Sequence, residues 1–159
     1  MRSTDDDALD RWTLTGVAAR LAGNLSPEVK IGGSGRRYEQ LDVGELAAHV
    51  DAWLIAWPPG TGLPMHDHAG SSAAVYVLRA ELVERYIDED RIVERRLIAG
   101  DRVLLPPDHL HEVVNASGNE ALSLHVYSPK LTTLRFRSEF AAVTAGSTDI
   151  LAAEASSTS

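Results

Sequence analysis

The chain has 159 residues, of which 44% are hydrophobic and 24% are charged. This length and composition suit one domain that buries a real core. The formal net charge of −8 argues against non-specific binding to nucleic acid, because such binding needs cationic groups that face phosphate. Cysteine is absent, so disulfides, thiolate metal ligands and a cysteine nucleophile are excluded, and any metal must be held by nitrogen or oxygen.

The sequence also bears on the compartment. No uninterrupted apolar run approaches the ~20 residues that span a bilayer. The acidic start, residues 1–7, lacks the apolar stretch of a signal peptide. We therefore expect a cytoplasmic protein with neither a membrane nor a nucleic-acid partner. Exposed strand edges leave the oligomeric state open between a monomer and a homodimer.

Residues 1–30 are predicted to be a helical segment. Apolar side chains recur there at roughly helical spacing, namely Leu9, Trp12, Leu14, Val17, Ala18 and Leu21. Gly23 and Asn24 form a stop signal, which Pro27 reinforces.

Residues 31–144 are predicted to form a second unit, built of short strands between Gly, Pro and Asp turns. The run 50–57 is apolar on both faces, which predicts a strand that is buried on two sides. The turn at 117–119 predicts a hairpin between the strands that flank it. We expect a mainly β sandwich or small barrel with the N-terminal helix packed on it, and a loose tail over residues 145–159. The remaining strands are expected at 74–79, 82–87, 92–99, 103–105, 112–115, 121–127 and 131–137.

Two pairs of histidines stand out among the six in the chain. His66 and His68 are two residues apart, so on a strand both imidazoles point to one face and can reach one ion. His109 and His111 repeat this spacing further along the chain. One such pair is weak support for a metal, but two pairs at strand ends of a β-rich domain predict a metal site.

The residues around these pairs resemble the two motifs of the cupin family, whose fold is a single jelly-roll β-barrel. The fit favours His111 over His109 as the third ligand, and His109 is then interpreted as a rim residue pointing to the opposite face. Ala73 stands where cupins place a ligand Glu, and Ala80 replaces a closing Gly. The resemblance therefore implies three neutral imidazoles and no carboxylate around the metal. The matching residues are Gly60, His66, His68, Gly100, Pro106, His111 and Asn115.

A narrower resemblance is to the thiol dioxygenase branch, meaning cysteine dioxygenase and its bacterial relatives. Ser123, His125 and Tyr127 are similar to the Ser-x-His-x-Tyr stretch of that branch, which forms a hydrogen-bonded relay beside the iron. These side chains share one face of an extended strand, and buried polar groups in a row need partners. A solvent-facing polar row is the alternative. The family's cross-linked cysteine falls at Ala73, so Tyr127 is expected to be a free phenol.

The resemblance implies a non-heme iron(II) enzyme with the metal on His66, His68 and His111. Its expected partners are dioxygen and a small thiol carboxylate, either cysteine or a compound like 3-mercaptopropionate, which becomes the sulfinic acid. The relay would accept the thiol proton or donate hydrogen bonds. Three alternatives stay open: a three-histidine iron oxygenase acting on a cysteine-derived thiol in a secondary metabolic pathway, a metal-binding cupin without turnover, and a zinc hydrolase.

Four further residues are predicted to bind the substrate. In the family, the arginine that binds the carboxylate lies two residues after a Tyr, whereas Tyr38 is followed at that distance by Gln40. This looks like the bacterial branch that prefers 3-mercaptopropionate and uses an arginine downstream of the relay. Arg135 and Arg137 lie at about the right distance, and a guanidinium can pair with a carboxylate in a bidentate manner. The sequence does not choose between the two, and either is otherwise a solvated strand residue.

Overall fold

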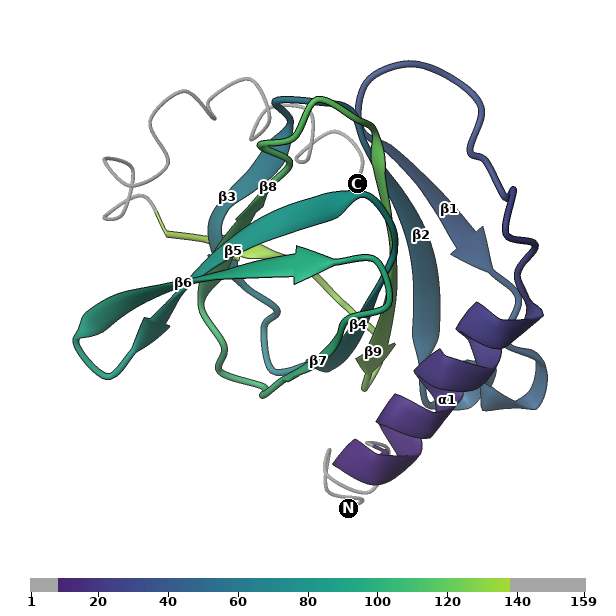
Figure 1. The fold of residues 1–159 in the computed structure, drawn as a ribbon. Coiled ribbons are helices and arrows are strands. Elements are labelled where there is room, and N and C mark those ends of the chain that lie inside the picture. The colour runs from purple at the N-terminus through teal and green to yellow at the C-terminus, as the bar shows by residue number, and fades with distance from the viewer. Residues whose placement is uncertain (1–8, 138–159) are drawn as a thin grey trace.

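The computed structural model describes residues 9–137 and shows strands gathered into two layers with one helix, α1 (Arg11–Asn24), against the outside (Figure 1). A short 3-10 helix, η2 (Gly44–Ala48), precedes the second strand. The strands are β1 (Arg37–Leu41), β2 (Asp51–Trp57), β3 (Gly62–Asp67), β4 (Ser72–Arg79), β5 (Glu81–Asp88), β6 (Arg91–Ile98), β7 (Arg102–Leu105), β8 (His111–Val114), β9 (Ala121–Ser128) and β10 (Arg135–Phe136).

The strands form two antiparallel sheets of five strands each. The first sheet has the order β1-β2-β9-β4-β7 and the second has the order β10-β3-β8-β5-β6. Over residues 9–137 no ladder of hydrogen bonds joins the two sheets. The expected jelly roll is therefore confirmed, but as two facing sheets rather than as a closed barrel.

The helix begins where an aspartate satisfies its free N–H groups. The Asp10 carboxylate accepts hydrogen bonds from the backbone N–H groups of Trp12 and Thr13. One face of α1 then packs on the outer side of the first sheet, with both elements contributing to one cluster: Leu14, Val17, Ala18, Val50, Ala52, Leu54, Ala74, Leu124 and Val126. Within the described residues no helix has the length and hydropathy to cross a membrane.

The period-2 alternation of strand residues explains why β2 and β9 are buried on both faces. Ala52 and Leu54 of β2 pack under the helix, whereas Ile55 and Trp57 enter the core between the two sheets. The prediction of a two-sided strand is confirmed. On β9, Leu124 packs under the helix, and the residues that alternate with it face the interior between the sheets.

Two expectations about pairing differ from the structure. The turn at 117–119 does not form a hairpin, because β8 pairs with β3 and β5 of the second sheet, whereas β9 pairs with β2 and β4 of the first. The chain crosses between the sheets at this turn. The strand expected at 131–137 is reduced to two residues, which pair with β3. The tail expected at 145–159 lies outside the described residues.

Candidate metal centre

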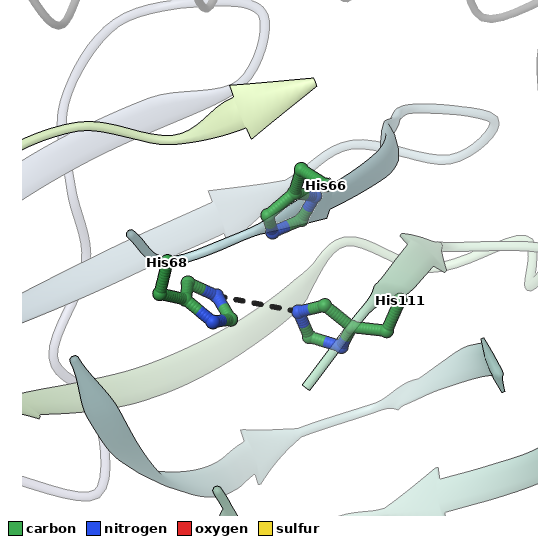
Figure 2. A group of neighbouring side chains, drawn as sticks. All are labelled: His66, His68 and His111. Carbon is green, nitrogen blue, oxygen red and sulfur yellow. Dashed lines mark hydrogen bonds between the residues drawn. The ribbon is translucent and has the colours of Figure 1, made fainter. Parts of the chain in front are cut away.

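Three histidines converge at one end of the second sheet (Figure 2). His66 on β3 and His111 on β8 are register partners, so their side chains lie on the same side of the sheet. His68 follows two residues after His66, just beyond the end of β3. The ring centroids lie 4.7 to 5.0 Å apart, and one nitrogen of each ring lies within 4.8 Å of the other two.

Hydrogen bonds on the outer side of two rings decide which nitrogen is free. His66 Nδ1 donates to the Pro64 carbonyl at 2.7 Å, and His111 Nδ1 contacts the Glu84 carboxylate at 2.6 Å. Each of these rings therefore keeps its lone pair on Nε2 when it is neutral. His68 Nε2 and His111 Nε2 are 3.4 Å apart, close to the ~3.4 Å that separates two nitrogens ~2.1 Å from one ion at a tetrahedral angle.

The protonation of the three rings suits metal binding. Burial lowers the pKa of His66, His68 and His111 below the usual value of 6.5, so each imidazole is neutral near neutral pH. Within residues 9–137, His68 Nδ1 is buried without a hydrogen-bond partner, so that ring depends on Nε2 for its polar contacts. Three neutral imidazoles with converging nitrogens fit a divalent metal ion, so the cluster has the geometry and chemistry to hold one.

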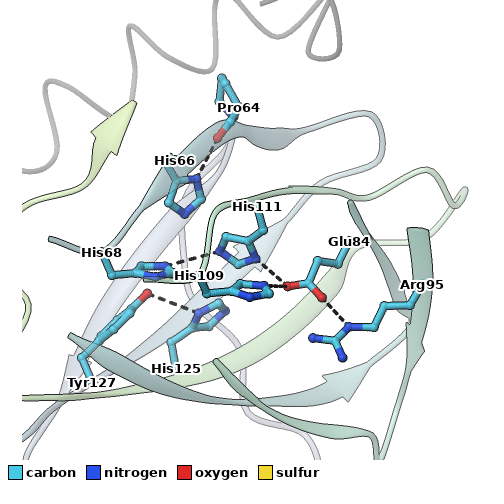
Figure 3. A network of polar contacts seen from close by, with 9 residues as sticks. All are labelled: Pro64, His66, His68, Glu84, Arg95, His109, His111, His125 and Tyr127. Atoms are coloured by element: carbon cyan, nitrogen blue, oxygen red, sulfur yellow. Dashed lines mark hydrogen bonds and ion pairs between the residues drawn. The ribbon is translucent and has the colours of Figure 1, made fainter. Parts of the chain in front are cut away.

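A buried glutamate on β5 lies directly behind this cluster (Figure 3). Glu84 is 1% exposed, and its Oε2 contacts both His111 Nδ1 and His109 Nε2, the latter at 3.0 Å. Its Oε1 accepts a hydrogen bond from Arg95 on β6. Burial alone raises the pKa of Glu84, but the hydrogen bonds from His109 and His111 outweigh burial and hold that pKa well below its usual value. Glu84 is therefore ionised.

The position of His109 corrects the interpretation that it points to the opposite face. Its ring centroid lies 4.9 Å from that of His111, and both rings contact the same carboxylate oxygen. His109 precedes β8 by two residues, so it keeps the same side as His111. It belongs to the surroundings of the metal centre.

The polar face of β9 forms a chain of hydrogen bonds that ends beside the histidines, and Figure 3 shows its last link, between His125 and Tyr127. Ser123 Oγ and His125 Nε2 are 2.8 Å apart, and His125 Nδ1 and Tyr127 Oη are 3.3 Å apart. The Tyr127 ring lies 5.5 Å from the His68 ring. All three side chains are buried, so they do not form a solvent-facing row.

A tryptophan anchors the far end of this chain of hydrogen bonds. Trp57 Nε1 donates to Ser123 Oγ at 2.8 Å, which leaves the serine hydroxyl one hydrogen and one lone pair for other partners. Burial lowers the pKa of His125 to about 3, so the ring is neutral and carries one proton. With that proton on Nδ1, His125 donates to the oxygen of Tyr127, and the phenol hydrogen can point toward the metal-binding site.

The four predicted substrate-binding residues lie in different surroundings. Tyr38 is partly buried against the core between the sheets, whereas Gln40 is exposed on the edge strand β1. Arg135 and Arg137 both pair with Asp67, at 2.7 and 3.0 Å, and their side chains are 60% and 42% exposed. These two guanidiniums hold the carboxylate of Asp67, which lies between His66 and His68 in the sequence.

An arginine not considered from the sequence lies nearer to the relay. The guanidinium carbon of Arg36 is 5.1 Å from the ring centroid of Tyr38 and 5.3 Å from that of Trp57. Burial is the main cause that lowers the pKa of His66 and of His125, and the positive charge of Arg36 adds to it. Arg36 is therefore a cation on the side of the site that the relay lines.

Comparisons with known proteins agree with this geometry. A family model described as Cysteine dioxygenase type I matches residues 29–139. A cysteine dioxygenase type 1 from Danio rerio is 29% identical over 110 residues, which make up 62% of this chain and 55% of that protein. The chain thus spans about half the length of this relative.

Similar solved structures share the fold. An oxalate oxidase superposes with a TM-score of 0.58 and 20% identity over 72% of this chain and 63% of that one. A cupin domain from Schizosaccharomyces pombe superposes with a TM-score of 0.53 and 12% identity over 65% of this chain and 66% of that one. At sequence identities this low, the similarity supports the jelly-roll fold alone.

Proposed function

Because the chain belongs to the cysteine dioxygenase type I family, we propose that it is a non-heme iron(II) thiol dioxygenase that converts a small thiol carboxylate and dioxygen to the sulfinic acid. The observation that carries this proposal is that the Ser123–His125–Tyr127 chain of hydrogen bonds ends at the three-histidine site. A metal-binding protein without turnover has no need for a buried relay that stops beside its metal.

We propose that His66, His68 and His111 hold Fe(II). Bound there, the ion would supply a coordination position that favours the substrate thiolate and would activate dioxygen, so that both oxygen atoms are transferred to sulfur. A zinc hydrolase would need a general base on the open side of the metal. The buried carboxylates around the histidines are otherwise engaged: Glu84 contacts His109 and His111, Glu112 pairs with Arg85, and Asp67 pairs with Arg135 and Arg137.

The relay acts in this proposal as a hydrogen-bond donor rather than as a base. Burial raises the pKa of Tyr127 well above 10, so the phenol stays protonated, and His125 with a pKa of about 3 is a poor proton acceptor. Ser123 and His125 hold the Tyr127 oxygen in place and leave its hydrogen directed toward the reacting sulfur and oxygen atoms. Because folding has already oriented this donor, no free energy is needed to reorient it during the reaction.

We propose that Arg36 binds the substrate carboxylate, in place of Arg135 or Arg137. The side chains of the latter two are 60% and 42% exposed to solvent, where a carboxylate gains less from a charged partner. The Arg36 guanidinium lies over the Trp57 ring, whose indole N–H anchors the relay, so its charge reaches the side of the site where the substrate would lie. A guanidinium can bind a carboxylate through two parallel hydrogen bonds.

The proposal is tested by metal analysis of the purified protein, followed by oxygen-uptake assays of the Fe(II)-loaded enzyme with a panel of thiols. Stoichiometric formation of the sulfinic acid from cysteine or 3-mercaptopropionate, read by mass spectrometry, is expected. Oxygen uptake only with a larger cysteine-derived thiol would instead support the alternative of a three-histidine iron oxygenase in a secondary metabolic pathway. Metal binding without uptake by any thiol would contradict an enzymatic role.

The role of Arg36 has its own test. Arg36→Gln is expected to raise KM for the preferred thiol carboxylate roughly 10- to 100-fold, which corresponds to losing a charged hydrogen bond of about 1.5–3 kcal/mol. KM for cysteamine, which has no carboxylate, should change little. Arg135→Gln and Arg137→Gln are the matched controls, and an equal rise in KM for one of these would assign the carboxylate to that arginine.

A further inference from the structure

Glu84 is a buried carboxylate that the proposed reaction does not use, although it contacts a metal ligand. On β5, Glu84 lies two residues before Tyr86, so both side chains are on the same face of the strand. Tyr86 is the register partner of His111 on β8, so Glu84 shares the inward face of the sheet with that histidine. Its carboxylate lies 2.6 Å from His111 Nδ1, on the side of the ring opposite to the 3.4 Å contact of His111 Nε2 with His68. Figure 3 shows the three groups in this order.

The partners of Glu84 determine its charge and the tautomers of both rings. Arg95 donates to Oε1, and the two histidines share Oε2. An ionised carboxylate only accepts hydrogen bonds, so His111 Nδ1 and His109 Nε2 must both carry protons. A neutral His111 with its proton on Nδ1 has its lone pair on Nε2, where it can bind a metal.

We propose that Glu84 is the positioning residue of the metal centre: it holds His111 in the tautomer and orientation that coordinate the ion, and Arg95 and His109 hold Glu84. This inference rests on the metal centre proposed above. A carboxylate behind a histidine ligand fixes the ring and increases its basicity. Loss of such a partner typically lowers metal affinity roughly 10- to 100-fold.

A second metal ion is the competing explanation of the same residues, since Glu84, His109 and His111 also have ligand atoms within 4.8 Å of one another. That site would need lone pairs on His111 Nδ1 and His109 Nε2. Glu84 Oε2 lies 2.6 and 3.0 Å from these nitrogens, which are hydrogen-bond distances that require protons on them. The carboxylate and Arg95 therefore favour the positioning role.

The decisive experiment measures metal affinity rather than turnover. Glu84→Gln and wild-type protein are titrated with Co(II), whose visible spectrum reports its coordination, and with Fe(II) under anaerobic conditions. Glu84→Gln is expected to bind both ions roughly 10- to 100-fold more weakly. Glu112→Gln is the matched control, because Glu112 is equally buried, follows His111 directly and pairs with Arg85 instead. It should keep the wild-type affinity.

Heteronuclear NMR of the histidine rings in the metal-free wild type provides a test without a substitution. His111 is expected to show the Nδ1–H tautomer, and this signature should be mixed in Glu84→Gln. Equal affinities in the two Gln variants, or an Nε2–H tautomer in the wild type, would overturn the inference. So would two bound ions per chain that fall to one in His109→Gln. A wild type that binds no metal would instead overturn the proposed function.

Discussion

Lowering the pH should destabilise the metal-free protein, and His125 should account for a definable share of the loss. Burial lowers the pKa of His125 to about 3, from the 6.5 of an exposed histidine. Between these two values the unfolded chain binds a proton that the folded chain does not bind. The free energy of unfolding must therefore fall as the pH falls from 6.5 toward 3, and it is unaffected by this group above 6.5.

The magnitude follows from the width of this window. One proton taken up on unfolding changes the free energy of unfolding by about 1.4 kcal/mol per pH unit. Between about pH 7 and about pH 5, His125 should thus cost the folded state ~2 kcal/mol. Folded domains are typically stable by only about 5–15 kcal/mol, so the loss is easily measured. The buried rings of His66, His68 and His111 change in the same direction.

The assay is urea denaturation at a series of pH values, in the presence of a chelator, for the wild type and for His125→Asn. The variant loses hydrogen bonds, so it starts from a lower stability, but only the slope against pH matters. All other titrating groups are common to both proteins and cancel in the difference. The two curves should converge by ~2 kcal/mol between about pH 7 and about pH 5. If the free energies of unfolding of the two proteins instead changed in parallel with pH, His125 would not be buried in its neutral form. That result would also contradict the donor role proposed for the relay.

Three further changes test other parts of the structure. Tyr127→Phe should bind metal normally but turn over about 100-fold more slowly, the typical effect of removing one oriented donor, and an unchanged rate would refute its donor role. Ser123→Ala leaves a buried indole N–H and a buried ring nitrogen unpaired, which should lower the free energy of unfolding by about 1–3 kcal/mol for each group, as read from urea denaturation. Gly62→Ala would bring a Cβ within 2.4 Å of the Val113 carbonyl oxygen, so the free energy of unfolding should fall by about 1–3 kcal/mol. Gly118→Ala, where a Cβ meets nothing within 4 Å, is the control and should change that free energy little.

The parts of the site that follow from local periodicity could be predicted from the sequence. The i and i+2 spacing of His66 and His68, and that of Ser123, His125 and Tyr127, requires only that each segment be extended. The structure brings both groups to one place. Knowledge of how the two strands pair was not needed to see that each set shares a face.

The parts that depend on pairing could not be predicted in this way. A turn signal at 117–119 does not tell whether the next strand returns to the same sheet or crosses to the other, and here it crosses. Glu84 lies two residues after Leu82 and so on the same face of β5, and the burial of Leu82 places that carboxylate in the core. The other face of β5 also carries apolar residues, Val83 and Ile87, so the sequence pattern does not decide which face is inward. Arg36 precedes its strand and carried no pattern at all.

One small residue, Ala73, affects the charge around the metal centre. Ala73 is fully buried on β4 and is the register partner of Tyr127 on β9, so this position lies beside the phenol that ends the relay. A glutamate here, as in the cupin motif, would bring a negative charge against a hydroxyl group that must stay protonated. The carboxylate of Glu84, which contacts a ligand ring, lies behind His111 rather than among the ligands. A divalent ion held by these three imidazoles would keep its full positive charge for an anionic thiolate, as the proposed function requires.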